Sequence, residues 1–106
     1  VFDNSSVGIK RIDNFSLNNI YNYPNPFNPI TTLRYDLSEN AFVRITVFDM
    51  LGKVVSNLMS TNQYSGNKSV QWNATNNQGQ PVSAGVYFYT IQAGEFRQTK
   101  KMVLLK

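Results

Sequence analysis

The sequence contains no cysteine and no histidine. Without cysteine the chain has no disulfides, thiolate metal ligands or cysteine nucleophiles, and without histidine it lacks the commonest general base and metal ligand. Only six carboxylates are present, too sparse for a calcium site to be argued. The closest acid pair, Asp36 and Glu39, flanks an expected turn, where solvated or capping roles are the alternative to glycosidase-like chemistry. We therefore expect no enzymatic activity, no metal and no cofactor.

Charge is also scarce, since charged residues make up 15% of the chain against about 25% in ordinary soluble domains. The net charge is +4, and four of the basic residues fall near the end of the chain, at Arg97, Lys100, Lys101 and Lys106. The other basic residues are scattered, which argues against nucleic-acid binding. The surface must instead be rich in Asn, Ser, Thr and Gln, a composition that suits an extracellular β-protein.

No apolar run approaches the roughly 18 residues of a membrane span, and no signal-peptide pattern follows Val1. We therefore expect no transmembrane segment. Because the sequence does not begin with methionine, we expect it to be part of a longer polypeptide, with any export signal upstream.

The residues that are present favour β-structure in one domain. Residues 32–37 alternate strictly between apolar and polar side chains, and residues 42–48 repeat this pattern. Residues 86–91 form the most β-prone run and are expected to be a central strand, while no segment has a sustained helical period. About seven short strands separated by turns predict an immunoglobulin-like antiparallel β-sandwich. We expect Trp72 to lie in its core.

Two regions are expected along the chain: a linker or leading strand at residues 1–20 and the sandwich at residues 21–106. The first region is rich in Asn and Ser and has only scattered apolar residues, among them Val7, Ile9, Phe15 and Leu17. Three prolines between Pro24 and Pro29 predict an extended, polyproline-like segment at the start of the sandwich. That segment is either a recognition element or a rigid lead-in to a strand.

Five motifs occur in a characteristic order: Tyr23–Pro29, Val47–Val55, Ala84–Tyr89, Gly94 and Lys100–Lys106. In this order the chain resembles the type A C-terminal sorting domain of the bacterial type IX secretion system, from about Tyr21 to Lys106. The related immunoglobulin-like domain of flagellar hook-capping proteins is similar around Gly85–Tyr87.

The resemblance implies a targeting module without chemistry of its own. Such domains follow a cargo domain that has reached the periplasm, direct its transfer across the outer membrane through the type IX translocon, and are usually removed by a sortase-like peptidase. That peptidase can join the cargo to surface lipopolysaccharide. The resemblance therefore implies a secreted or cell-surface protein, fused upstream to cargo.

Candidate recognition residues lie in the motifs and are Pro24, Asn25, Pro26, Phe27, Leu51, Gly52, Lys53, Gly85, Val86, Tyr87, Lys100, Lys101, Met102, Val103, Leu104, Leu105 and Lys106. For Gly52 and Gly85, backbone geometry is the competing explanation. The last strand combines β-prone apolar residues with lysines, so a partner could read it by edge pairing and charge. Alternatively, alternate residues face the core and the lysines protect an edge from aggregation.

Two other functions remain open at this stage. A carbohydrate-binding sandwich would use Tyr64, Trp72, Tyr87 or Tyr89 as stacking platforms, provided that these rings are exposed. A surface assembly module would pair its edge strands or its N-terminal residues with neighbouring subunits.

Overall fold

A computed structural model describes residues 15–105. Every regular element in this range is a strand. The seven strands are β1 (Leu17–Tyr23), β2 (Thr31–Leu37), β3 (Ala41–Phe48), β4 (Val54–Gln63), β5 (Gly66–Trp72), β6 (Gly85–Ala93) and β7 (Phe96–Leu104). The described residues thus confirm the predicted all-β fold.

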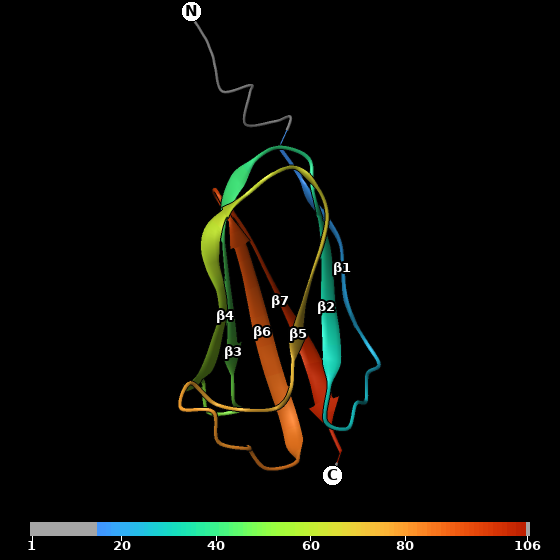
Figure 1. The fold of residues 1–106 in the computed structure, drawn as a ribbon, viewed down its shortest axis with the longest axis vertical. Helices are drawn as coiled ribbons and strands as arrows, with labels where there is room; N and C mark the ends of the chain where they lie inside the picture. Colours follow the sequence, from blue (N-terminus) through green and yellow to red (C-terminus); the bar gives the residue numbers. More distant parts are fainter. Residues whose placement is uncertain (1–14, 106) are drawn as a thin grey trace, which may run out of the picture.

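The strands form two antiparallel sheets that face each other (Figure 1). One sheet has the order β1-β2-β5, and the other has the order β4-β3-β6-β7. β6 lies between β3 and β7, as its apolar composition predicts, and β7 is an edge strand. This arrangement is the predicted immunoglobulin-like sandwich.

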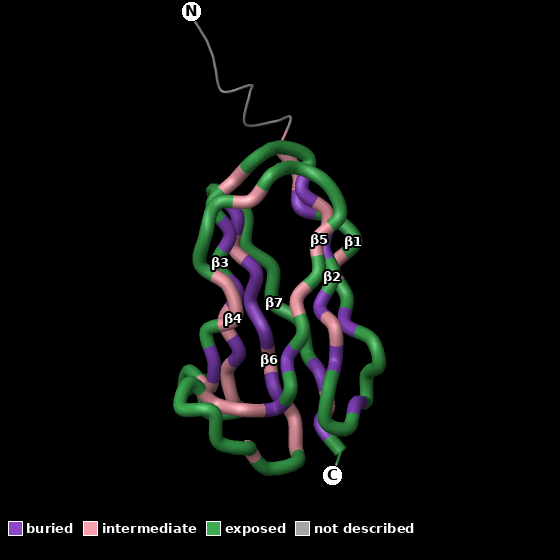
Figure 2. The backbone as a smooth tube through the Cα atoms, viewed as in Figure 1, coloured by how far each residue is buried: buried purple, intermediate pink, exposed green. Residues whose placement is uncertain are grey.

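Buried and more exposed residues alternate along the strands (Figure 2), and the buried ones form the core between the sheets. Leu33 and Tyr35 of β2 face Val43 and Ile45 of β3, and all four side chains are at most 1% exposed. Trp72, at the end of β5, is also 1% exposed, as predicted. Because apolar and polar residues alternate with the two-residue period of a strand, burying one face exposes the other.

β1 is a well-paired strand of the three-stranded sheet, running antiparallel to β2 with a register shift between Asn18 and Tyr21. It begins at Leu17 and therefore spans the boundary expected at residue 20. Phe15 and Leu17 pack into the domain's own core, so these two residues are not free anchors for a neighbouring subunit. Val7 and Ile9 lie outside the described residues.

The proline segment differs from its prediction. It connects β1 to β2, bends at residues 24–26 and 28–29, and has three cis X–Pro bonds. The bends show that the prediction of an extended, polyproline-like conformation was wrong. The physical reason is that Phe27 is only 1% exposed, which requires the chain to turn inward at this point.

Candidate functional site

Four of the five motifs lie wholly or partly at one end of the sandwich, and Gly94 lies in the turn after β6 at the opposite end. Successive strands alternate in direction, so the connections after β1, β3 and β5 and the last residues of β7 all lie at the same end (Figure 1). We call this end the motif end. It consists of residues 24–30, 49–53, 73–84 and 103–105. The opposite end carries the connections after β2, β4 and β6.

At the motif end, the proline segment is hydrogen-bonded to the last residues of β7. The Phe27 N–H donates to the Val103 carbonyl at 2.9 Å, and the Leu105 N–H donates to the Phe27 carbonyl at 2.8 Å. The side chain of Asn25 accepts from the Val103 N–H at 3.0 Å and donates to the Lys101 carbonyl at 3.3 Å. We call these four hydrogen bonds the Asn25–Phe27 clamp. Two motifs from opposite ends of the sequence therefore form one surface.

Aromatic packing joins a third motif to this surface. The Phe27 ring lies 5.8 Å from the Trp72 ring, and the Trp72 ring lies 5.4 Å from that of Tyr87 in an edge-to-face arrangement. The Tyr87 hydroxyl donates to the Ser83 carbonyl at 2.6 Å. Phe27 and Tyr87 are both buried, so they shape this end of the molecule from inside.

A buried polar network supports the clamp, and the sequence analysis missed it. The Asn22 side chain donates to the Thr31 hydroxyl, which donates in turn to the Pro24 carbonyl at 2.8 Å. The Tyr89 hydroxyl donates to Asn22 at 3.3 Å, and burial raises the pKa of Tyr89 to about 12. No sequence signal pointed to this network, because the apolar pattern of β1 assigns Tyr21 and Tyr23, not Asn22, to the buried face.

The turn between β3 and β4 lies on another side of the same end (Figure 1). The Asp49 carboxylate accepts hydrogen bonds from the N–H groups of Leu51 and Lys53, at 2.9 and 3.0 Å. Gly52 has φ +84°, a conformation that favours glycine. The Leu51 side chain is 87% exposed. The turn thus holds an apolar side chain out in solvent.

The other candidate residues divide into exposed and buried groups. Lys100 and Lys101 are exposed, Leu105 is 51% exposed, and Met102 and Leu104 are buried. Pro24 and Pro26 are exposed, while Val86 is half-buried and pairs with Val103 across the ladder. Gly85 begins β6 with φ +151°. Lys106 lies outside the described residues.

The two carboxylates considered for acid chemistry, Asp36 and Glu39, lie in a strand and in the bend that follows it. Asp36 lies in β2 and accepts a hydrogen bond from the Asn19 side chain at 2.5 Å, while Glu39 follows in the exposed bend after β2. Within residues 15–105, no group of three or more acidic residues could hold a metal ion. The same range has no helix long and apolar enough to cross a membrane.

Three of the four candidate sugar platforms are buried, so that interpretation was wrong for Trp72, Tyr87 and Tyr89. Their rings fill the core because the alternation of β5 and β6 points them inward. Tyr64 is different, since it is 77% exposed at the end opposite the motif end.

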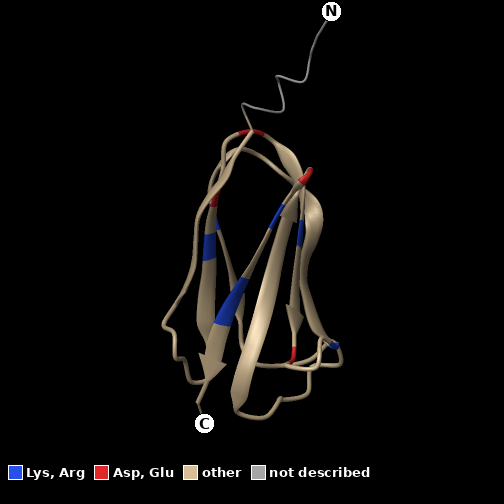
Figure 3. Cartoon of the chain, turned by 180° about the vertical axis from the view of Figure 1, so that it is seen from behind, with Lys and Arg blue, Asp and Glu red and all other residues tan. Residues whose placement is uncertain are grey.

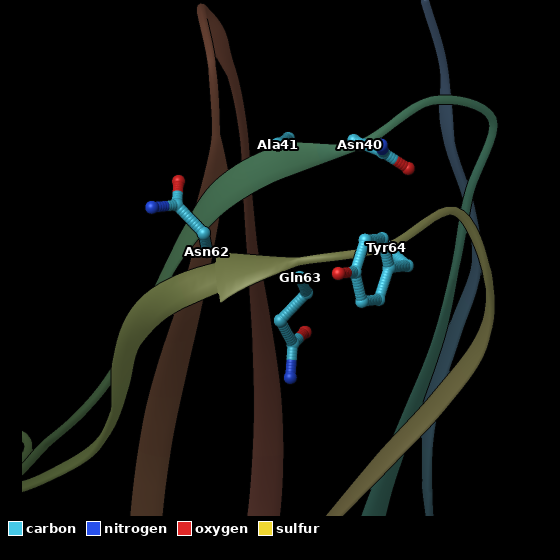
Figure 4. Close-up of a pocket in the computed structure, with 5 residues that line it drawn as sticks. All are labelled: Asn40, Ala41, Asn62, Gln63 and Tyr64. Carbon is cyan, nitrogen blue, oxygen red and sulfur yellow. The ribbon is translucent and has the colours of Figure 1, made fainter.

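Tyr64 borders a hollow of about 320 Å³ between the start of β3 and the end of β4 (Figure 4). The other lining residues are Asn40, Ala41, Asn62 and Gln63. Asn40 accepts a hydrogen bond from the Ser65 N–H, and Gln63 accepts one from the Tyr35 hydroxyl. The Asn62 side chain has no hydrogen-bond partner among the described residues and points away from Gln63 (Figure 4).

Comparison with known families identifies the chain. Residues 21–105 match the family model of the secretion system C-terminal sorting domain, and the protein belongs to this family. The family relationship predicted from the ordered motifs is confirmed, as is the function of a C-terminal sorting module for secretion. Its family is one of non-catalytic modules, and membership implies an upstream cargo and export to the cell surface or the extracellular space.

Solved structures share the fold. PorU from Porphyromonas gingivalis, described as dimeric and latent, matches with a TM-score of 0.66 and 19% identity over 81% of this chain. PorZ from the same organism, a surface component of its type IX secretion system, matches with a TM-score of 0.59 and 22% identity over 82% of this chain. The present chain spans only 9% of the PorU chain and 11% of the PorZ chain.

A DNA glycosylase from Pseudomonas fluorescens, AlkC bound to DNA, matches with a TM-score of 0.59 and 13% identity. The match covers 88% of this chain and 31% of AlkC. Because identities this low show the fold alone, we draw no functional conclusion from these structures. No curated protein matches the chain.

Proposed function

We propose that this domain directs a cargo protein, fused upstream, from the periplasm across the outer membrane by type IX secretion. The translocon and a sortase-like peptidase are its partners, and the cargo is released or attached at the cell surface. The domain itself has no catalytic activity and acts as a recognition surface. Its role is to hold that surface in one shape until the machinery has engaged it.

The observation that carries the proposal is the Asn25–Phe27 clamp. Hydrogen bonds from Asn25 and Phe27 hold residues 101–105 in place. Lys101 and Leu105, both exposed, are therefore fixed beside the exposed prolines Pro24 and Pro26. A surface ordered before binding loses less conformational entropy when a partner docks, which favours specific recognition.

The clamp also limits which groups in the last residues of β7 a partner can bind. The outward backbone groups of Val103 and the N–H of Leu105 already have partners. Pairing a foreign strand with this stretch would require the removal of Phe27 from the core. We therefore expect recognition of residues 103–105 through exposed side chains, not through their backbone.

The test is export of a reporter fused to the N-terminus of the chain in a bacterium with a type IX system. The double variant Lys101→Glu, Leu105→Ser changes two exposed side chains of the segment that the clamp holds and leaves the clamp backbone intact. Its reporter should accumulate in the periplasm. The matched control, Lys68→Glu with Tyr64→Ser, changes one cation and one exposed apolar ring elsewhere and should export normally. Normal export of both double variants would refute the proposal.

A second candidate function rests on the exposed Tyr64 ring. Sugar rings stack on such aromatic faces, and the unpartnered Asn62 amide could hydrogen-bond a sugar hydroxyl. A soluble glycan that binds saturably to the domain, with binding lost in Tyr64→Ala, would support this function. Equal binding by Tyr64→Ala and the unchanged domain would exclude it.

A further inference from the structure

The outer edge of β7 is divided into a closed half and an open half. In the closed half, the Asn25–Phe27 clamp bonds both outward groups of Val103, the Leu105 N–H and the Lys101 carbonyl, but not the Lys101 N–H. Because outward backbone groups recur every second residue, Arg97 and Thr99 also point their N–H and C=O groups to this edge. The outward N–H and C=O groups of Arg97 and Thr99 have no hydrogen-bond partner among residues 15–105. The open half therefore retains unpaired backbone donors and acceptors.

The open half is also uncovered on its inner face. Met102 and Leu104 are buried, whereas Gln98 and Lys100, which lie on the same face of the strand, are exposed. A hollow of about 220 Å³ lies here between the two sheets, lined by β1 residues 17–20 and by Gln98 and Lys100 of β7. The edges of β1 and β7 thus leave room beside the unpaired backbone.

The charge on the β7 side of this hollow has one sign, whereas on the β1 side Asn19 donates a hydrogen bond to the Asp36 carboxylate of β2. Arg97, Lys100 and Lys101 are exposed along β7, and cations follow the strand in Figure 3. β7 contains no carboxylate, and β1 and β6 contain no charged residue at all. The nearest carboxylate in sequence is Glu95, in the turn that precedes β7. This edge therefore attracts negative charge.

The clamp shows that the outer edge of β7 can pair with an extended segment. Phe27 and Leu104 form a parallel bridge, so the proline segment is already a very short additional strand beside β7. We propose that the open half of β7, Arg97–Lys101, binds an extended acidic segment of the secretion machinery, which continues this row as an added strand. The site itself follows from the edge, and only the source of the segment rests on the proposed function.

A second copy of this chain is a poor occupant of the edge. Antiparallel pairing of two β7 strands about Thr99 would place Arg97 of one copy opposite Lys101 of the other. Like charges directly opposite each other destabilise a strand pair. The same cations that select an acidic strand therefore oppose self-association, a common role of lysine on edge strands.

The test uses a ten-residue peptide of alternating glutamate and valine, titrated into the isotope-labelled full chain and followed by NMR. Added-strand binding predicts shifts and slowed exchange of the Arg97, Thr99 and Lys101 amides, with those of Val103 and Leu105 unchanged. The same peptide with alternate backbone nitrogens methylated keeps its charge but loses its donors, and should bind at least tenfold more weakly. Equal binding of both peptides would overturn the proposal, because charge alone would then explain it.

Two charge-reversal variants locate the site. Lys100→Glu, Lys101→Glu should weaken binding of the peptide at least tenfold. Arg44→Glu, Lys68→Glu changes the net charge equally on other strands and should weaken it less than threefold. Equal weakening by the two double variants would overturn the proposed location.

Export separates this inference from the proposed function. If the Lys100→Glu, Lys101→Glu variant loses both peptide binding and reporter export, both proposals are supported. Loss of export with no peptide binding by the unchanged domain would overturn the added strand and leave the sorting function standing. Loss of peptide binding with normal export would overturn the assignment of the partner to the secretion machinery.

Discussion

The side-chain oxygen of Asn25 accepts a hydrogen bond of 3.0 Å from the backbone N–H of Val103, 78 residues further along the chain. Asn25 lies between two prolines, neither of which has an N–H to offer. Its amide side chain therefore takes a place in the ladder that a backbone group would normally fill. Through this contact the proline segment and the C-terminal strand depend on each other for their shape.

Replacing Asn25 with alanine should loosen the end of β7. The change leaves the Val103 N–H and the Lys101 carbonyl without partners, which we expect to lower the free energy of unfolding by about 1–2 kcal/mol. Urea denaturation measures the loss. Amide exchange should accelerate at Val103 but not at Arg97. Asn28→Ala, a change of an exposed neighbour without a side-chain hydrogen bond in the structure, serves as the control and should alter neither quantity.

Trp72 should be among the most sensitive positions in the domain. Its ring lies between Phe27 and Tyr87, and its indole N–H donates to the Thr75 carbonyl at 2.9 Å. Trp72→Ala removes both contacts and leaves a cavity, at a cost of about 3–5 kcal/mol. Chemical denaturation provides the measurement. Trp72→Phe keeps an aromatic ring and should lose less stability than Trp72→Ala. Equal losses of stability in the two variants would show that the ring packing is unimportant.

The sequence was sufficient to predict the sandwich because strand alternation is local. Leu33 and Tyr35 are separated by one polar residue, and this spacing alone assigns them to one face. The same argument correctly placed Val43 and Ile45, whose partners across the core did not need to be known. Turn chemistry is local as well, since the Asp49 carboxylate accepts from the N–H groups of Leu51 and Lys53 just ahead of it.

Contacts between distant segments could not be predicted in this way. In β1, the apolar pattern would bury Tyr21 and Tyr23, yet both are exposed and Asn22 between them is buried. Asn22 is satisfied by Thr31 and Tyr89, and a single sequence does not reveal that these groups meet. The clamp could not be predicted for the same reason. The proline segment and the C-terminal motif could each be recognised in the sequence, but the contact between them is long-range.

Leu51 provides a way to separate recognition from stability. Its side chain is 87% exposed, so Leu51→Ser should change the free energy of unfolding by no more than about 0.5 kcal/mol. If the turn contacts the secretion machinery, export of a fused reporter should nevertheless fall several-fold. Urea denaturation measures the free energy of unfolding, and pulse-chase fractionation measures export. Thr61→Ser, at an exposed position of β4, is the control and should leave export unchanged, whereas normal export of Leu51→Ser would exclude the turn from recognition.

Tyr89 predicts an alkaline limit to stability. Burial raises its pKa from 10.0 to about 12, and burial also raises the pKa of Tyr35, partly opposed by the hydrogen bond to Gln63. Below about pH 9, both tyrosines are protonated in the folded and unfolded states, so their titration does not affect stability. Between pH 10 and 12, the unfolded chain loses the Tyr89 proton while the folded chain retains it. The unfolded state thus binds fewer protons, and stability must fall as pH rises.

Urea denaturation from pH 8 to pH 11.5 measures this fall, and absorbance at 295 nm follows ionisation of the tyrosines. Tyr89→Phe removes the titrating hydroxyl together with its bond to Asn22. It should therefore be less stable at pH 8 but lose stability less steeply above pH 10. An equally steep loss in Tyr89→Phe and the unchanged domain would mean that other groups set the alkaline limit.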